Sequence, residues 1–212
     1  MEGKKPSKIP IIIVIGVVFL LIVTGLTLLF RRFSPMANIN FGSGQSVAEL
    51  RYPLDIPSLF DRRQTDSNLS KGRQNVLRLL LREFESPGQG TKYSEGVAEP
   101  WCADFVSWIL HEAKIPLKNP HSGSWRIPGV YTLREYFQSV GRYHLLASGY
   151  QPLPGDVVFY DEGSFGTHVN FFVDIDGDTI FTLGGNENFK VFLQQFDYRD
   201  EKYGAIGFGQ IE

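Results

Sequence analysis

Residues 167–191 read THVNFFVDIDGDTIFTLGGNENFKV, two runs rich in β-branched and aromatic residues on either side of Asp176-Gly177. Short runs of this composition around an Asp-Gly dipeptide are typical of a β-hairpin with a tight turn. We therefore predict antiparallel strands over 168–175 and 178–184. Similar runs predict further strands over 156–160, 189–195 and 205–211.

The residues that precede these strands follow a helical period. Apolar side chains at 76, 77, 80, 81 and 84 would share one face of a helix that begins near Gln74 and ends at Ser86-Pro87-Gly88. A second helix is predicted over 101–113. Thr132 and Glu135 have the spacing of a capping box, which predicts a third helix that ends near Gly141. Helices followed by antiparallel strands indicate an α+β domain with the helices packed on the sheet.

An uncharged apolar segment, Ile9–Phe30, lies near the start of the chain. At about 1.5 Å per residue it is long enough to cross a hydrocarbon core of roughly 30 Å, so it predicts a single transmembrane helix. A cleaved signal peptide is the alternative, but its apolar region usually has only about 7–15 residues. Arg31-Arg32 follows this segment, although Pro35-Met36-Ala37 leaves a cleavage site conceivable.

We therefore expect a cytoplasmic tail over 1–8, an anchor over 9–30, a stalk or linker over 31–71 and a domain over 72–212. The linker is rich in Ser, Asn, Gly, Asp and Pro and shows no persistent helical or strand period. Basic residues on the two sides of the anchor slightly favour a domain on the extracytoplasmic side of the cell membrane.

Composition narrows the partners that the chain can have. The formal net charge is −2 and 42% of the residues are hydrophobic, which predicts a folded core and no nucleic-acid partner. A single cysteine excludes a disulfide within the chain. No His/Cys cluster suits zinc, no glycine run has the setting of a nucleotide-binding loop, and the acidic turn 174–178 lacks the remaining ligands of a calcium loop. We expect neither a metal nor a cofactor.

The one cysteine, Cys102, follows Pro100-Trp101 at the predicted start of the second helix. Backbone N–H groups at a helix N-terminus and the helix dipole both favour a thiolate, which is the nucleophilic form. The alternative is a small buried apolar residue, the commoner role of a free cysteine. Two neighbours in sequence, Asp104 and Tyr93, are possible supporting residues, although a helix-terminal charge and a core aromatic explain them equally well.

A thiolate nucleophile needs a base, and His168 is the best placed of the four histidines. It opens an apolar strand, where packing would hold the imidazole rigidly beside a helix N-terminus. A third polar group should orient the ring. Counting back from the turn at Asp176-Gly177 brings Asn186 close to His168, and an amide can accept the hydrogen bond of the ring N–H. Asn188 is the second candidate.

Three segments together resemble the CHAP family, the cysteine- and histidine-dependent amidohydrolases and peptidases. They are EPWCADFVSWIL (99–110), PLPGDVVFY (152–160) and the stretch 167–191. The resemblance covers about 72–212 and implies a papain-like fold that cleaves amide bonds in peptidoglycan. It also implies that Cys102 is the nucleophile, His168 the base, and Asn186 or Asn188 the third residue.

The leading hypothesis is therefore a membrane-anchored peptidoglycan amidase or endopeptidase. One alternative is an inactive wall-binding or scaffolding module of the same fold, against which the complete set of Cys102, His168 and Asn186 argues. Another is an anchored protein that binds a partner in a secretion or division complex, for which the anchor and the stalk would suffice.

Overall fold

The computed structural model describes residues 56–212 as an α+β unit. The predicted anchor 9–30 lies outside the described residues, and no helix within 56–212 has the length and apolar character that a membrane crossing requires. The helices are α2 (Ile56–Gln64), α3 (Lys71–Glu85), α4 (Gly90–Tyr93), α5 (Cys102–Glu112) and α6 (Val130–Ser139), with short 3-10 turns η2 (Leu146–Ser148) and η3 (Glu201–Tyr203).

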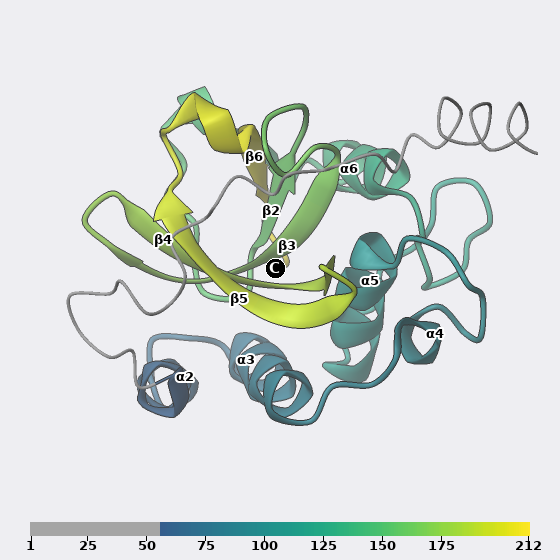
Figure 1. Cartoon of the computed structure of the whole chain (residues 1–212), viewed down its shortest axis with the longest axis horizontal. Helices are drawn as coiled ribbons and strands as arrows, with labels where there is room; N and C mark the ends of the chain where they lie inside the picture. Colours follow the sequence, from purple (N-terminus) through teal and green to yellow (C-terminus); the bar gives the residue numbers. More distant parts are fainter. Residues whose placement is uncertain (1–55) are drawn as a thin grey trace, which may run out of the picture. The chain divides into compact units, whose positions relative to one another are not determined.

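The strands form one antiparallel sheet in the order β1-β6-β2-β3-β4-β5. Their bounds are β1 (Tyr143–Leu145), β2 (Val157–Tyr160), β3 (His168–Asp176), β4 (Thr179–Glu187), β5 (Lys190–Asp197) and β6 (Ala205–Gly209). The predicted hairpin is present, because β3 pairs with β4 in antiparallel register and Asp176 lies opposite Thr179. Figure 1 shows that the sheet is strongly curved.

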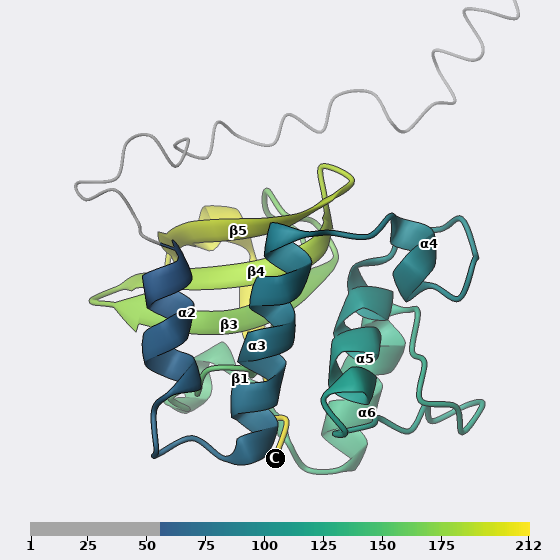
Figure 2. The same cartoon turned by 90° about the horizontal axis from the view of Figure 1, so that it is seen from below.

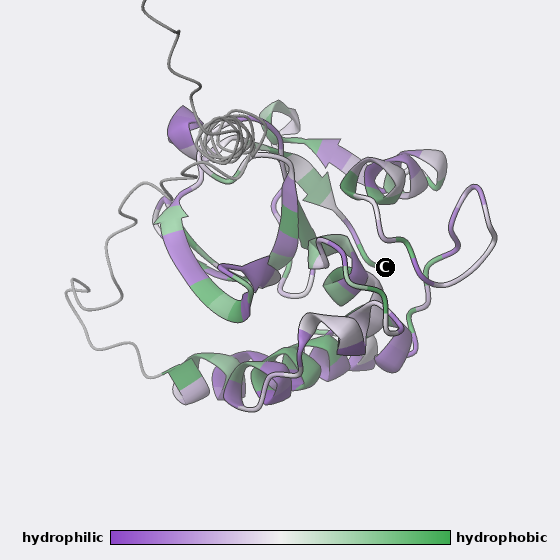
Figure 3. Cartoon of the chain, turned by 45° about the vertical axis from the view of Figure 1, so that its right-hand side comes forward, coloured by the Kyte–Doolittle hydropathy of each residue, from purple (hydrophilic) through white to green (hydrophobic). Residues whose placement is uncertain are grey.

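Helices α2, α3 and α5 cover one side of this sheet, as the view in Figure 2 shows. Hydrophobic and hydrophilic segments alternate along these helices and along the strands (Figure 3), as expected of elements that bury one face. The main core lies between the helices and the sheet, and its largest members include Phe105 of α5 and Phe171 of β3. A second cluster, which includes Tyr160, Phe172 and Phe196, lies on the other side of the sheet.

Several elements differ from the sequence-based expectations. Part of the expected linker, Ile56–Gln64, forms α2, and its Leu59 and Phe60 are buried in the core. The third helix begins at Val130 after Gly129, without a side-chain cap, so Thr132 is not the capping residue. The short elements β1 and α4 had no detectable period because three or four residues are too few to show one.

A buried ion pair connects the helices to the start of β2. The guanidinium of Arg73 in α3 lies 2.9 Å from Asp156 Oδ1, and both side chains are almost fully buried. Asp156 also accepts hydrogen bonds from the Tyr150 hydroxyl at 2.8 Å and the Ile211 N–H at 3.2 Å. These contacts fix β2 and its neighbour β3 relative to the helical layer.

Candidate active site

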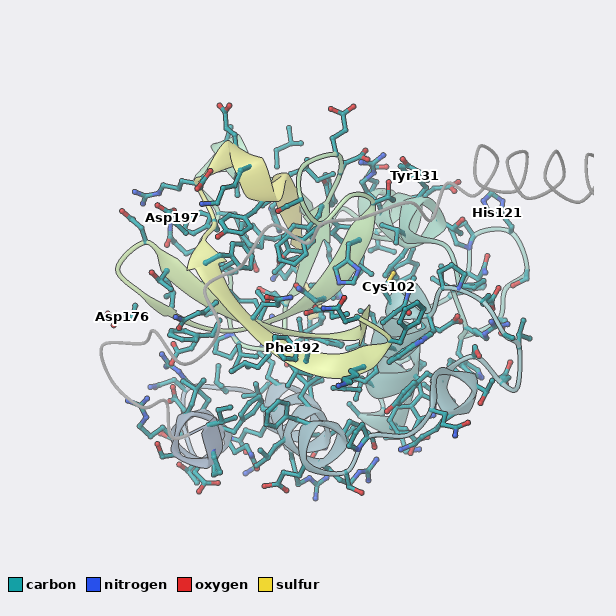
Figure 4. The ribbon with its side chains drawn as sticks, viewed as in Figure 1. Cys102, His121, Tyr131, Asp176, Phe192 and Asp197 are labelled. Atoms are coloured by element: carbon teal, nitrogen blue, oxygen red, sulfur yellow. The ribbon has the colours of Figure 1, made fainter. Side chains whose placement is uncertain are left out.

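Cys102 is the first residue of α5, and its side chain is largely buried, with the residue 6% exposed. The preceding Trp101 is the N-cap but makes no side-chain capping hydrogen bond. The first-turn N–H groups of α5 are therefore free of a capping side chain, and they point outward from the end of the helix that carries the thiol. Figure 4 shows Cys102 at this end of α5, far from the Asp176 turn.

His168 is the first residue of β3, on the side of the sheet that carries the second aromatic cluster, and it is 7% exposed. Its imidazole hydrogen bonds with the Cys102 thiol. Burial by itself lowers the pKa of His168, but the hydrogen bonds and negative charges of Cys102 and Glu187 more than reverse this effect and raise it to about 10. His168 is therefore set up as an imidazolium at neutral pH.

The residue that orients the imidazole is Glu187, not Asn186 as the sequence suggested. Glu187 Oε1 lies 3.3 Å from His168 Nε2, and Glu187 is 3% exposed. Within residues 56–212, no hydrogen bond joins Asn186 or Asn188 to the imidazole. Because Nε2 faces the carboxylate, Nδ1 is left for Cys102, and a negative group lies on each side of the ring.

A β-bulge explains this difference. Phe171 pairs with Leu183, and continuing that register to the ends of the strands places Asn186 opposite His168, as the sequence count assumed. However, the pairing of β4 with β5 shifts between Gly184 and Glu187, and Asn186 has a left-handed backbone with φ of 60°. An extra residue in a strand reverses the alternation of side chains beyond it. Glu187 thus takes the side that Asn186 would otherwise have occupied.

Two glycines before Glu187 allow this local geometry. A Cβ at Gly184 would lie 2.4 Å from Glu187 Oε1, so the missing side chain makes room for the carboxylate. A Cβ at Gly185 would lie 2.4 Å from the Trp101 ring and 2.6 Å from Phe105 Cβ. The strand can therefore approach the start of α5 closely, which brings the imidazole to the thiol. The pattern Gly-Gly-Asn in the sequence was a signal of irregular backbone, and with it of a bulge.

Asp104 and Tyr93, the two possible supporting residues, make no contact with the His168 imidazole among the interactions of residues 56–212. The Asp104 carboxylate pairs with Arg126, whose Nε lies 2.7 Å from its Oδ1, and Glu99 binds the same guanidinium. Arg126 thereby offsets a negative charge two residues from the thiol. Tyr93 stacks on Trp101 at 5.1 Å between ring centroids, and its hydroxyl donates to the buried Glu83 carboxylate at 2.8 Å. Tyr93 thus supports the residue that precedes Cys102.

The surroundings of the site are aromatic. Phe165 stacks on His168 at 6.0 Å between centroids and covers one face of the imidazole. Among residues 56–212 there is no cluster of His, Cys, Asp and Glu side chains that could hold a metal ion. Chemically, the arrangement has the groups that a nucleophile, a proton carrier and an orienting residue would require.

One of the comparisons with known proteins found a match. The model of the CHAP domain family matches residues 92–186, a range that contains Cys102, His168 and most of β4. No curated protein and no solved structure matches the chain. This match identifies a CHAP domain within the chain, a type of domain that occurs in amidase- and peptidase-type hydrolases.

Proposed function

We propose that this protein is a membrane-anchored hydrolase that cleaves amide bonds of peptidoglycan, with Cys102 as nucleophile and His168 as proton carrier. The observation that carries the proposal is the hydrogen-bonded series Cys102–His168–Glu187 at the start of α5. A buried structural cysteine would not need an imidazolium partner that a buried carboxylate orients. The family match supports peptidoglycan as the substrate class.

The reaction follows from the position of each group. The Cys102 thiolate attacks the carbonyl carbon of the scissile amide, and the oxygen that gains the electron pair lies near the free N–H groups of the first turn of α5. The His168 imidazolium then donates its proton to the leaving amine, and a thioester remains on Cys102. Neutral His168 next removes a proton from water, which attacks the thioester and releases the carboxylic acid and the thiolate.

Glu187 has two effects in this cycle. Its carboxylate stabilises the imidazolium electrostatically, and its hydrogen bond to Nε2 keeps Nδ1 directed at the thiol. The site is largely buried, so these interactions are stronger than they would be in water. Phe165 further excludes water from one face of the imidazole.

The test uses the full-length protein in detergent with purified peptidoglycan. The wild type should release new amino groups and termini. Mass spectrometry of the soluble fragments should show which bond is cleaved, and so whether the enzyme is an amidase or an endopeptidase. Cys102→Ala should release none and remain folded by circular dichroism. If the wild type and Cys102→Ala give the same fragments, the hydrolase proposal is wrong and a binding or scaffolding role replaces it.

The membrane part of the proposal rests on the sequence. The segment Ile9–Phe30 is uncharged and long enough for one crossing, and an extracytoplasmic domain would meet peptidoglycan directly. The protein should remain in the membrane fraction after extraction at alkaline pH, and protease added to spheroplasts should degrade the domain. Recovery of a chain that lacks this segment from the medium would instead support a cleaved signal peptide.

A further inference from the structure

Asn170 is an uncharged polar residue in the middle of an otherwise apolar part of β3. It is fully buried between Val169 and Phe171 in the chain, with an exposed fraction of 0%. An amide buried without hydrogen bonds would destabilise the fold, so the partners of Asn170 matter. Asn170 lies on the same side of the strand as His168, two residues further on.

The amide of Asn170 makes three hydrogen bonds, one of them to the active site. Its Nδ2 donates to Glu187 Oε1 at 3.2 Å and to Thr182 Oγ1 at 3.0 Å. Its Oδ1 accepts from the Tyr160 hydroxyl at 3.0 Å. The hydroxyls of Thr182 and Tyr160 also hydrogen bond with each other. Asn170, Thr182 and Tyr160 therefore form a closed ring in which each residue donates and accepts.

This ring determines which way the amide faces. Burial and the nearby charge of Glu187 keep the pKa of Tyr160 well above its usual value, so its hydroxyl keeps its proton and donates to Oδ1. Glu187 is a carboxylate and can only accept, so Nδ2 must face it. A reversed amide would direct Oδ1 at the carboxylate and lose both donor contacts. The ring thus directs the second N–H of Asn170 at Glu187.

Glu187 depends on this contact because its two oxygens are bound unequally. Oε1 accepts from both Asn170 and His168, whereas Oε2 is buried and has no hydrogen-bond partner among the described residues. One oxygen therefore holds the whole carboxylate in place. Without the amide, the carboxylate would keep a single hydrogen bond and could rotate away from the imidazole.

We propose that Asn170 is a positioning residue for the reaction, which acts through Glu187 by holding its carboxylate against His168 Nε2. The role in catalysis rests on the proposed function, whereas the effect on the imidazole does not. The ionisable groups that face His168 are Cys102 from α5, Glu187 from β4 and Tyr160 from β2, whose ring lies 6.0 Å away. Asn170 hydrogen bonds to two of them, Glu187 and Tyr160, and Tyr160 stays neutral.

The experiment compares Asn170→Ala with Phe172→Leu in the full-length protein. Phe172 is buried on the same side of β3 and belongs to the second aromatic cluster, so its substitution controls for a general loss of stability. The protonation midpoint of His168 is measured by NMR with ¹³C-labelled histidine, and the His168→Ala spectrum assigns the signal. Asn170→Ala should lower this midpoint by about one pH unit, which corresponds to a tenfold change in proton affinity. Phe172→Leu should leave it unchanged.

Hydrolysis provides the second measurement. Asn170→Ala should lower kcat about tenfold with little change in KM, because the amide does not meet the substrate. Thr182→Val, which keeps Asn170 but opens the ring, should shift the His168 midpoint in the same direction by a smaller amount. If Asn170→Ala does not fold, the His168 midpoint of Thr182→Val tests the positioning role instead.

An unchanged His168 midpoint in the folded Asn170 or Thr182 variant overturns the proposal, as does an equal shift in Phe172→Leu. The NMR titration needs no substrate, so it tests the positioning role of Asn170 separately from the proposed hydrolase function. A shifted midpoint in a protein without hydrolase activity would support the positioning role and refute the proposed function.

Discussion

Replacement of Glu187 by glutamine tests how the site is built, because glutamine keeps the shape of the side chain and removes its charge. At the 3.3 Å separation of Glu187 Oε1 and His168 Nε2, opposite unit charges attract by about 5 kcal/mol at an effective dielectric constant of about 20. Desolvation offsets much of this attraction. A hydrogen bond to a charged group contributes about 1.5–3 kcal/mol net, against about 1 kcal/mol for a neutral one.

The difference of about 0.5–2 kcal/mol corresponds to a fall in kcat of roughly 2- to 30-fold for Glu187→Gln. The pKa of His168, which is raised to about 10 in the wild type, should fall by about 0.5 to 1.5 pH units. The alkaline limb of the rate profile, where the imidazolium loses its proton, should move to lower pH by the same amount. Both are measured from amine release on a soluble peptidoglycan fragment between pH 5 and pH 11.

The matched control is Asn186→Gly. Glycine adopts the left-handed backbone of Asn186, with its φ of 60°, without strain, so only the amide side chain is lost. This variant should keep kcat within about twofold and keep the alkaline limb of the wild type. The reasoning is refuted if Asn186→Gly is as impaired as Glu187→Gln, or if Glu187→Gln retains the kcat and pH profile of the wild type.

Three further predictions concern the surroundings of the site. Gly184→Ala should lower kcat at least tenfold on purified peptidoglycan, because its Cβ would lie 2.4 Å from Glu187 Oε1 and displace the carboxylate; wild-type kcat would contradict this. Burial raises the pKa of Asp104 to about 6, although Arg126 opposes the effect. In the unfolded chain the pKa of an aspartate is about 3.9, so the folded state binds the proton of Asp104 more tightly. Asp104 therefore makes the protein less stable as pH rises from about 4 to about 6. The Tm of Asp104→Asn minus that of the wild type should rise over this pH range. A Tm difference that stays constant would disprove the raised pKa of Asp104. Arg73→Met leaves the buried Asp156 carboxylate without its cation and should lower the free energy of unfolding by about 3–5 kcal/mol in a urea titration, whereas a loss below about 1 kcal/mol would show that the pair contributes little.

Most of the regular elements could be predicted from the sequence because their patterns are local. The hairpin 168–184 followed from composition and the Asp-Gly dipeptide, and the structure confirms antiparallel pairing there. The helix that begins at Cys102 was predicted within one residue of its observed start. Helix α2 escaped prediction because Leu59 and Phe60 give too short an apolar pattern, and their burial against the domain is a tertiary effect.

The sequence by itself determined a thiol at the leading end of a helix, a histidine at the start of an apolar strand, and an antiparallel sheet that follows the helices. Tertiary structure decided which side chain completes the site. Strand alternation indicated Asn186, but the bulge reversed that alternation and turned Glu187 toward His168. The bulge lies where Gly185 meets Trp101, and such contact between distant segments leaves no period in the sequence.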